Sequence, residues 1–366
     1  MNSSLPLTKL QSKLKDNNID ILIINRSDEF LNEYISPYAE RLKYITNFSG
    51  SAGKLIVLQN EAYLYVDGRY TIQAKEQINS DMIKSKHLSL FWNNLKKYIS
   101  KKNCKIAIDP KLHSIKEIKK IQDYMLSSSS TIKFLDLNII DTIWENKPSI
   151  EYTNIFDHPV KFSGTSRIKK LNDCGKFLEN KNIDHFLVTG LDNIAWLLNI
   201  RANDILYTPL VFSYLLISKK LRPSLYINKD KINDKLKSEL EKNINIFQIN
   251  KIENIFSKLK NYDVVGLDFS TTTYFFLNIL EKNNIKYKDI TNPIILSKAV
   301  KNQTEQIGAI NANLRDGVSV TRYIYWLKNK IDLKATSELS ASKYLRDLRV
   351  KNNLFHSLSF DTISAF

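Results

Sequence analysis

An internal repeat constrains the fold of the first 290 residues more than any other feature of the sequence. Four short segments recur in the same order, each displaced by close to 160 residues. Such self-similarity at one spacing is the signature of a duplicated structural unit. The four pairs of matching segments are 18–24 with 182–188, 42–47 with 194–199, 62–67 with 224–228, and 105–109 with 264–268. We therefore expect two related domains.

Each copy alternates short apolar runs with stretches of helical period, which predicts an α/β fold. A helix is expected over 4–17, with three leucines on one face, before a strand over 19–24. The runs 55–58 and 62–66 predict a hairpin. In the first copy Ser114, and in the second Ser270 or Thr271, are expected to cap the next helix.

A third region begins at Asn292-Pro293, where Pro293 is expected to stop the element before it. Helices are expected from about 302 and over 337–351, the first with an apolar stripe, and a strand is expected to start within 358–366. Two helices and the start of a strand cannot bury a core of their own, so we expect the chain to end inside a domain. The expected boundaries are 1–145 and 165–291 for the two related domains, 146–164 for a linker, and 292–366 for the incomplete third domain.

The net charge of +16 is the compositional outlier. Most of it is carried by lysines scattered along helix-like segments, which favours solvated helix faces over a nucleic-acid surface.

No apolar run approaches the roughly 18 residues of a membrane helix, and no secretory signal opens the chain. Cys104 and Cys174 are isolated, which fits a reducing cytoplasm.

The loop Gly50-Ser-Ala-Gly53 invites two catalytic interpretations that its context excludes. A phosphate loop needs a helix after the glycines, whereas a strand is expected here. A nucleophile elbow needs Gly-x-Ser-x-Gly, which the loop lacks. A tight, closely packed turn is the better interpretation.

Two further groups of polar residues are interpreted as structural. The five histidines lie in different segments without metal-site spacing, and each is expected to be a surface or capping residue. Asp109 and Asp268 hold equivalent places in the two copies, which favours a shared role in a turn over a paired-carboxylate site. The histidines are His87, His113, His158, His185 and His356.

Arg69, in the turn Asp67-Gly-Arg-Tyr70, is the candidate binding residue. An arginine on a rigid turn suits recognition of a carboxylate or a peptide carbonyl. The alternative is an arginine paired with Asp67 or Glu76 within its own domain. Both interpretations stay open at this point.

Taken together, these segments resemble the three-domain Xaa-Pro aminopeptidases (aminopeptidase P) of the creatinase, prolidase and methionine aminopeptidase superfamily. The resemblance covers nearly the whole chain, in family order. It is carried by 27–35, 39–53, 66–74, 190–201, 297–305, 314–317 and 358–363.

The resemblance implies two related creatinase N-terminal-type (ribonuclease H-like) α/β domains, followed by the first helices of an incomplete pita-bread α+β domain. It implies release of the N-terminal residue from peptides with proline in second position. The cofactor would be two divalent metal ions, most readily manganese, that activate a bridging water. It also implies a cytoplasmic homodimer without nucleic-acid or membrane partners.

The resemblance places no catalytic residue and no metal ligand in this chain. In the family, all of them lie beyond the segment that matches Ser359 to Ile363, and His356 is not one of them by position. Arg69 alone carries over, as a substrate-binding residue.

We therefore expect an N-terminal, C-terminally truncated portion of an Xaa-Pro aminopeptidase, inactive by itself. The alternative is a non-catalytic peptide-binding or dimerisation module of creatinase-type domains.

Overall fold

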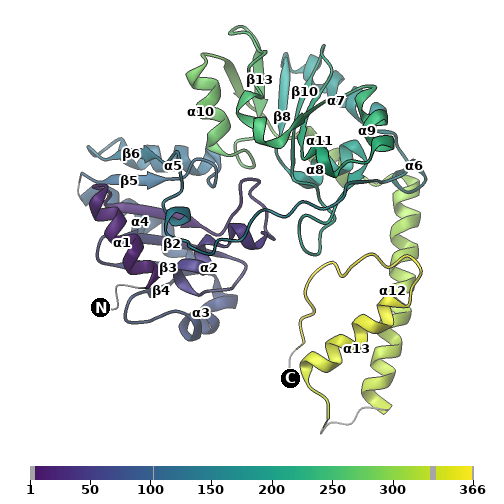
Figure 1. Ribbon diagram of the computed structural model, residues 1–366, viewed down its shortest axis with the longest axis horizontal. Coiled ribbons are helices and arrows are strands. Elements are labelled where there is room, and N and C mark those ends of the chain that lie inside the picture. Colours follow the sequence, from purple (N-terminus) through teal and green to yellow (C-terminus); the bar gives the residue numbers. More distant parts are fainter. Residues whose placement is uncertain (1–4, 102, 330–334, 365–366) are drawn as a thin grey trace.

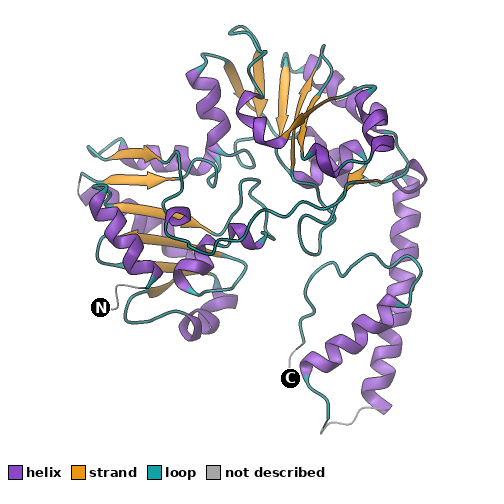
Figure 2. Cartoon of the chain, viewed as in Figure 1, coloured by secondary structure: helices purple, strands orange, loops and turns teal. Residues whose placement is uncertain are grey.

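A computed structural model of the chain describes residues 5–101, 103–329 and 335–364. Two α/β domains and a helical arm follow one another along these residues (Figure 1). Each domain is built around a six-stranded sheet, and the strands are drawn in orange in Figure 2. The predicted α/β architecture with two related domains is confirmed.

The first sheet has the strand order β4-β3-β2-β1-β5-β6. Strands β1, β2 and β3 form an antiparallel meander, and the predicted hairpin is its β2–β3 part. Strands β4, β5 and β6 each run parallel to their inner neighbour. The bounds are β1 (Ile21–Asn25), β2 (Gly53–Leu58), β3 (Ala62–Val66), β4 (Lys84–His87), β5 (Lys105–Ile108) and β6 (Thr131–Phe134).

The second sheet repeats this topology as β12-β11-β10-β8-β13-β14. The antiparallel pairs β8–β10 and β10–β11 and the parallel pairs at both ends match those of the first sheet. The recurring segments that form strands therefore occupy equivalent positions in the two sheets. The bounds are β8 (His185–Val188), β10 (Ser213–Ser218), β11 (Ser224–Ile227), β12 (Asn245–Gln248), β13 (Val264–Leu267) and β14 (Lys286–Asp289).

The helices of the first domain cover both faces of its sheet. Helix α1 buries the three predicted leucines against one face and begins at Pro6; Ser4 lies outside the described residues. Helices α4 and α5 contribute to the cluster on the other face. The bounds are α1 (Pro6–Asp16), η1 (Pro37–Ala39), α2 (Arg41–Thr46), η2 (Gly68–Tyr70), α3 (Thr71–Gln77), η3 (Leu88–Leu90), α4 (Phe91–Lys101), α5 (Ile115–Met125) and η4 (Ile140–Thr142).

The second domain carries α7, α8 and α9 on one face of its sheet. On the other face a short 3₁₀ segment, η6, stands where the first domain has the longer helix α4. The bounds are α7 (Arg167–Asn180), α8 (Leu191–Leu198), η5 (Lys229–Lys231), α9 (Asp234–Glu241), η6 (Ile249–Asn254) and α10 (Tyr274–Lys282).

The helix-cap prediction holds in one copy only. The Ser114 hydroxyl accepts a hydrogen bond from the amide of Glu117 at 3.1 Å and caps α5. In the second copy the residue before α10 is Thr273, whose side chain makes no capping bond. Ser270 instead donates to Asp268, three residues before the cap position. The prediction of Ser270 or Thr271 was wrong because the turn in the second copy is stabilised through Asp268.

The two domains contact each other through equivalent turns. Residues 110–116 and 269–275 exchange backbone hydrogen bonds, among them Ile115 to Thr272 at 2.9 Å and Tyr274 to His113 at 3.0 Å. Beside this contact, Phe30 stacks on Phe212 with ring centroids 5.1 Å apart. One hydrophobic cluster therefore extends through both domains.

The expected linker, 146–164, contains regular structure of its own. Strand β7 (Phe156–Asp157) pairs antiparallel with β9 (Ile200–Arg201), and the short helix α6 (Val160–Ser163) follows. Gly164 ends α6 with φ +67°, and a Cβ there would lie 2.4 Å from the side chain of Asn302. The position therefore requires glycine for both backbone and space.

The helical arm projects from the second domain (Figure 1). It comprises α12 (Gln303–Asn329) and α13 (Glu338–Val350), whereas the preceding α11 (Pro293–Ala299) packs on α7 and α8 of the second domain and buries Ile294 in its core. The apolar stripe of α12 is exposed at Ile307, Ile310 and Leu314. Ser337 caps α13. No helix among the described residues is long and apolar enough to cross a membrane.

Two details of residues 293–364 differ from the sequence predictions. Helix α11 was not predicted, because Pro293 was interpreted only as a stop; proline also suits the first turn of a helix, where its missing N–H costs nothing. The strand expected from residue 358 does not form over 358–364, since no strand lies beside it for pairing. Residues 365–366 lie outside the described part.

Candidate functional site

Arg69 lies in the 3₁₀ turn η2, directly before α3. Asp67 caps this turn by accepting the amide of Arg69 at 2.9 Å, and it also accepts the Arg69 Nη2 at 2.7 Å. The Arg69 hydrogen bond holds the pKa of Asp67 below its usual value. The Arg69 side chain is 67% exposed. Arg69 is thus paired with Asp67 in its own domain, as the alternative interpretation expected. Its guanidinium nevertheless remains accessible at the surface.

The loop 50–53 packs closely, as its sequence predicts. A Cβ on Gly50 would lie 2.2 Å from the ring of Phe48. The Ser51 hydroxyl and the Tyr70 hydroxyl are 2.6 Å apart, so the loop is tied to the turn that carries Arg69. Strand β2 follows at once from Gly53. The loop therefore helps to hold the turn that carries Arg69 in position.

Asp109 and Asp268 share a structural role in their turns. Each carboxylate accepts the amide two residues on, that of Lys111 at 2.9 Å and that of Ser270 at 3.0 Å. The second oxygen of Asp109 accepts the Asn138 side chain, and that of Asp268 accepts the Asn292 amide. Both oxygens of each carboxylate therefore accept hydrogen bonds within the turn region, in agreement with the predicted structural role.

A buried polar cluster joins β1, β2 and α5 of the first domain. Glu117 accepts from Lys54 at 2.5 Å and from Asn25 at 2.9 Å, and its carboxylate lies 3.3 Å from the ring of His113. Burial alone would raise the pKa of Glu117, but the charges of Lys54 and His113 outweigh it, and the pKa lies well below its usual value. Sequence reasoning missed this cluster, since its members come from separate segments.

A network of hydrogen bonds fixes the start of α12 on the second domain. The Trp196 Nε1 donates to Glu305 at 3.1 Å, and Glu305 and Asn302 cap α12 reciprocally. Asn302 also donates to the carbonyl of Ser163 at 2.9 Å. Burial lowers the pKa of Lys170, which lies 4.1 Å from the Trp196 ring, to about 8. The arm is therefore held in place at its origin.

A cavity of about 880 Å³ lies beside this network. Its walls come from β7, α6, β9, the first turns of α12 and residues 354–356. His158 and His356 both line it, although they are far apart in sequence. Arg201 and Arg315 line it as well. These residues were not predicted as a group, because no local pattern brings them together.

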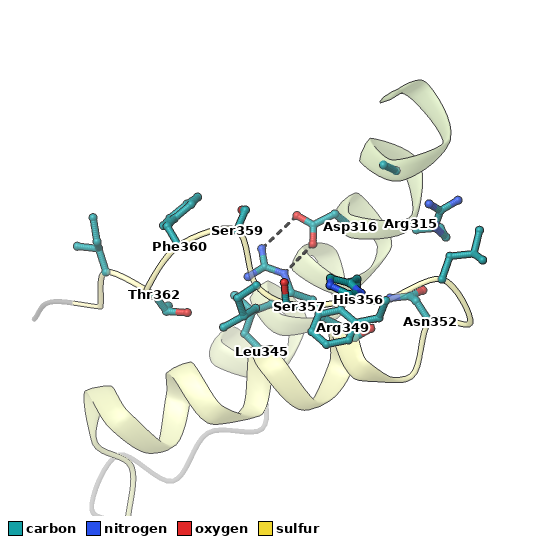
Figure 3. A pocket seen from close by; sticks show the side chains of 15 residues that line it. Arg315, Asp316, Leu345, Arg349, Asn352, His356, Ser357, Ser359, Phe360 and Thr362 are labelled. Carbon is teal, nitrogen blue, oxygen red and sulfur yellow. Dashed lines mark hydrogen bonds and ion pairs between the residues drawn. The ribbon is translucent and has the colours of Figure 1, made fainter. Parts of the chain in front are cut away.

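A second cavity, of about 540 Å³, lies between α12, α13 and residues 352–363 (Figure 3). Arg349 of α13 bridges Asp316 of α12 through two hydrogen bonds, of 2.6 and 3.1 Å. Arg315, Leu354 and His356 line both cavities, so the two share a wall.

The histidines occupy more varied positions than the surface or capping ones expected. His87 accepts from the amide of Ser89 and caps η3, and His356, which is exposed, donates from Nε2 to the Oδ1 of Asn203 at 2.9 Å. His113 and His185, by contrast, are buried, with 1% and 5% of their surface exposed. The expectation was wrong for these two, because both lie under the packed faces of their domains.

Comparison with known proteins places these features in a family. Two family models, both described as the creatinase/prolidase N-terminal domain, match residues 6–141 and 146–305. "Probable Xaa-Pro aminopeptidase P" of Paracoccidioides brasiliensis is 30% identical over the whole chain, and that of Aspergillus clavatus is 31% identical. The chain therefore belongs to the creatinase/prolidase N-terminal domain family.

A solved enzyme structure has the same fold. The X-prolyl aminopeptidase of Caenorhabditis elegans, described as a cytosolic enzyme with a di-nuclear active site, superposes on 98% of this chain with a TM-score of 0.89 and 26% identity. This chain spans 62% of that structure. It likewise spans 62% and 57% of the lengths of the two fungal aminopeptidase P relatives.

The described residues of this chain do not form a metal centre. No group of three or more His, Cys, Asp or Glu side chains converges as metal binding requires within 5–101, 103–329 and 335–364. The donor set expected for two divalent ions is therefore not supplied by this part of the chain, and no chemical step is assigned to such ions here.

Proposed function

We propose that this chain is the N-terminal portion of a metal-dependent Xaa-Pro aminopeptidase, which releases the first residue of peptides with proline in second position. The observation that carries the proposal is the match over the whole chain to proteins named Xaa-Pro aminopeptidase P, at 30–31% identity. The superposition on the C. elegans enzyme supports it. A cytoplasmic location, a homodimer, two manganese ions and a pita-bread third domain belong to the same proposal.

In this proposal the two α/β domains bind and orient peptide, and the helical arm begins the domain that carries the chemistry. The proposed domain boundaries are 1–145 and 165–291 for the two α/β domains, with a linker over 146–164, and 292–366 for the incomplete third domain. The exposed stripe of α12 supports an arm that needs further covering structure, since a helix buries its apolar face in a complete domain.

Arg69 is proposed as the substrate contact. Its exposed guanidinium sits on a turn held by Asp67 and by the Ser51–Tyr70 hydrogen bond. We expect Arg69→Ala to leave the melting temperature unchanged, because an exposed pair adds little stability, and to weaken binding of Ala-Pro-Phe several-fold in calorimetry. Lys84→Ala, which removes another exposed paired cation, is the control. If the Arg69 variant binds the peptide with unchanged affinity, Arg69 does not contact the substrate and its role is limited to the pair with Asp67.

The isolated 366-residue chain is proposed to be catalytically inactive. We expect no release of alanine from Ala-Pro-Phe when the purified chain is incubated with manganese, because the described residues gather no metal-ligand set. Mass spectrometry of the products is the measurement, with calorimetric binding of the same peptide as a check that the protein is folded and competent. Manganese-dependent release of alanine would refute the inactivity.

A further inference from the structure

The cavity beside Arg201 carries an excess of positive charge. Lys161, Arg201 and Arg315 line it, whereas Glu305 is the one carboxylate among its described lining residues. Both oxygens of Glu305 are already engaged, one by the Trp196 Nε1 and the other by the Asn302 amide. Three cationic residues therefore line the cavity against one carboxylate, whose two oxygens already accept hydrogen bonds.

Arg201 is the most informative of these cations. Its Nη1 donates to the carbonyls of Ala195 at 2.6 Å and Ile200 at 3.0 Å, which fixes the guanidinium at the end of β9. Within the described part of the chain it has no ion pair, and burial lowers its pKa. Arg201 is partly buried, and the two carbonyls satisfy hydrogen bonds without neutralising its charge, so an anion supplied from outside would be a favourable partner.

The rest of the cavity is apolar enough to hold more than a small ion. The rings of Phe156 and Phe162, together with Pro209 and Ile307, form much of its wall. Its volume of about 880 Å³ lies in the range of roughly 300–1,000 Å³ that is typical of small-molecule and peptide pockets. A ligand with an anionic end and apolar groups matches both parts of the lining.

We propose that this cavity binds the carboxylate of a short peptide, with the Arg201 guanidinium as its anchor and Lys161 and Arg315 as flanking charges. The inference builds on the proposed peptidase function by naming a chemical group of the peptide that the chain recognises. The planar fork of arginine matches a carboxylate through two parallel hydrogen bonds.

Free phosphate is the other anion to consider, and the geometry disfavours it. The first amides of a helix attract phosphate when they are open. Here the start of α12 is closed, because the Glu305 amide donates to Asn302 and the Glu305 carboxylate lies beside it. That negative charge repels a phosphate dianion more strongly than a single carboxylate.

The test compares two forms of one peptide. Calorimetry with the 366-residue chain measures the affinity of Gly-Ala-Phe as the free acid and as the C-terminal amide, and of inorganic phosphate. We expect the amide to bind about ten- to a hundredfold more weakly, which is the usual effect of losing a hydrogen-bonded charge pair. Because neither peptide has proline in second position, the result is independent of Xaa-Pro hydrolysis.

Variants locate the binding. Arg201→Gln should reduce affinity for the free acid to that of the amide, whereas Arg222→Gln, an exposed arginine bonded to the Glu241 carbonyl, should not. If Arg201→Gln does not fold, the double variant Lys161→Gln/Arg315→Gln decides, with an expected loss of about fivefold. Equal binding of acid and amide, wild-type affinity in the deciding variant, or tighter binding of phosphate than of the peptide acid would each overturn the proposal.

Discussion

Replacing Arg41 with methionine is expected to destabilise the first domain by about 3–5 kcal/mol, the usual cost of breaking a buried ion pair on one side. The Arg41 side chain is 5% exposed. Its Nε and Nη2 donate to the two oxygens of Asp141 at 2.8 and 2.9 Å, and Nη2 also approaches Glu29 at 3.3 Å. Methionine would leave both carboxylates facing an uncharged side chain.

The position of Arg41 explains why the effect should be large. It connects the start of α2 to η4, which are about a hundred residues apart in the chain. Glu29, its second partner, accepts from the Tyr38 hydroxyl at 2.8 Å, and its carbonyl accepts from Tyr214 of the second domain at 3.3 Å. Loss of Arg41 should therefore loosen the contact between the domains as well.

Urea denaturation followed by far-UV circular dichroism measures the change. The control is Lys43→Met, which removes the same charge from the exposed side of the same helix and should cost no more than about 0.5 kcal/mol. Equal stability of the Arg41 and Lys43 variants would show that the bidentate pair contributes nothing. The double variant Arg41→Met/Asp141→Leu should recover part of the loss, because it also removes the Asp141 charge, although Lys147, which donates to Asp141 at 2.7 Å, then loses that partner.

Replacing Glu117 with glutamine is expected to cost about 3 kcal/mol at pH 7, because it removes the negative charge that pairs with Lys54 and His113 in a largely buried cluster. Glu117 has 11% of its side chain exposed, and Lys54, which it pairs, has 25%. Lys54 also lies 5.1 Å from the ring of Phe91, so its surroundings are largely apolar. The matched control is Glu61→Gln, which breaks an exposed pair with Lys84 and should cost about 0–1 kcal/mol.

The pH dependence of this effect has a definite sign. The folded pKa of Glu117 is below its unfolded value, so its contribution is fully present above the unfolded pKa of about 4.3 and is lost as the pH falls. The stability difference between wild type and Glu117→Gln should therefore shrink steadily below about pH 4.5. Asp28, whose pKa burial raises to about 6, contributes in the opposite direction, but it is present in both proteins and cancels. A difference that grows on acidification would contradict this assignment.

Much of the fold follows from local sequence, because duplicated segments must adopt the same structure. The recurring runs at 18–24 and 182–188 became the equivalent strands β1 and β8, with the same neighbours. Asn47 and Asn199, which end two of the recurring segments, both adopt left-handed backbone at the end of a helix. Local rules failed where one side chain had a better partner, as Ser270 had in Asp268.

The candidate sites were less predictable than the fold. Arg69 could be singled out, since the strand, the glycine and the arginine are adjacent in sequence. The cavity around Arg201 could not, because Lys161, Arg201 and Arg315 come from α6, β9 and α12 and meet only after the arm docks through Trp196 and Glu305. The cluster around Glu117 depends in the same way on sheet register.

The central claim, that this chain supplies the N-terminal portion of an Xaa-Pro aminopeptidase, is tested most directly by a chimera. Residues 1–366 would replace the matching portion of the C. elegans X-prolyl aminopeptidase, which this chain superposes over 62% of its length. With manganese, the chimera is expected to release alanine from Ala-Pro-Phe and not from Ala-Ala-Phe. A chimera that unfolds cooperatively, and is therefore folded, yet shows no preference for proline in second position would contradict the claim.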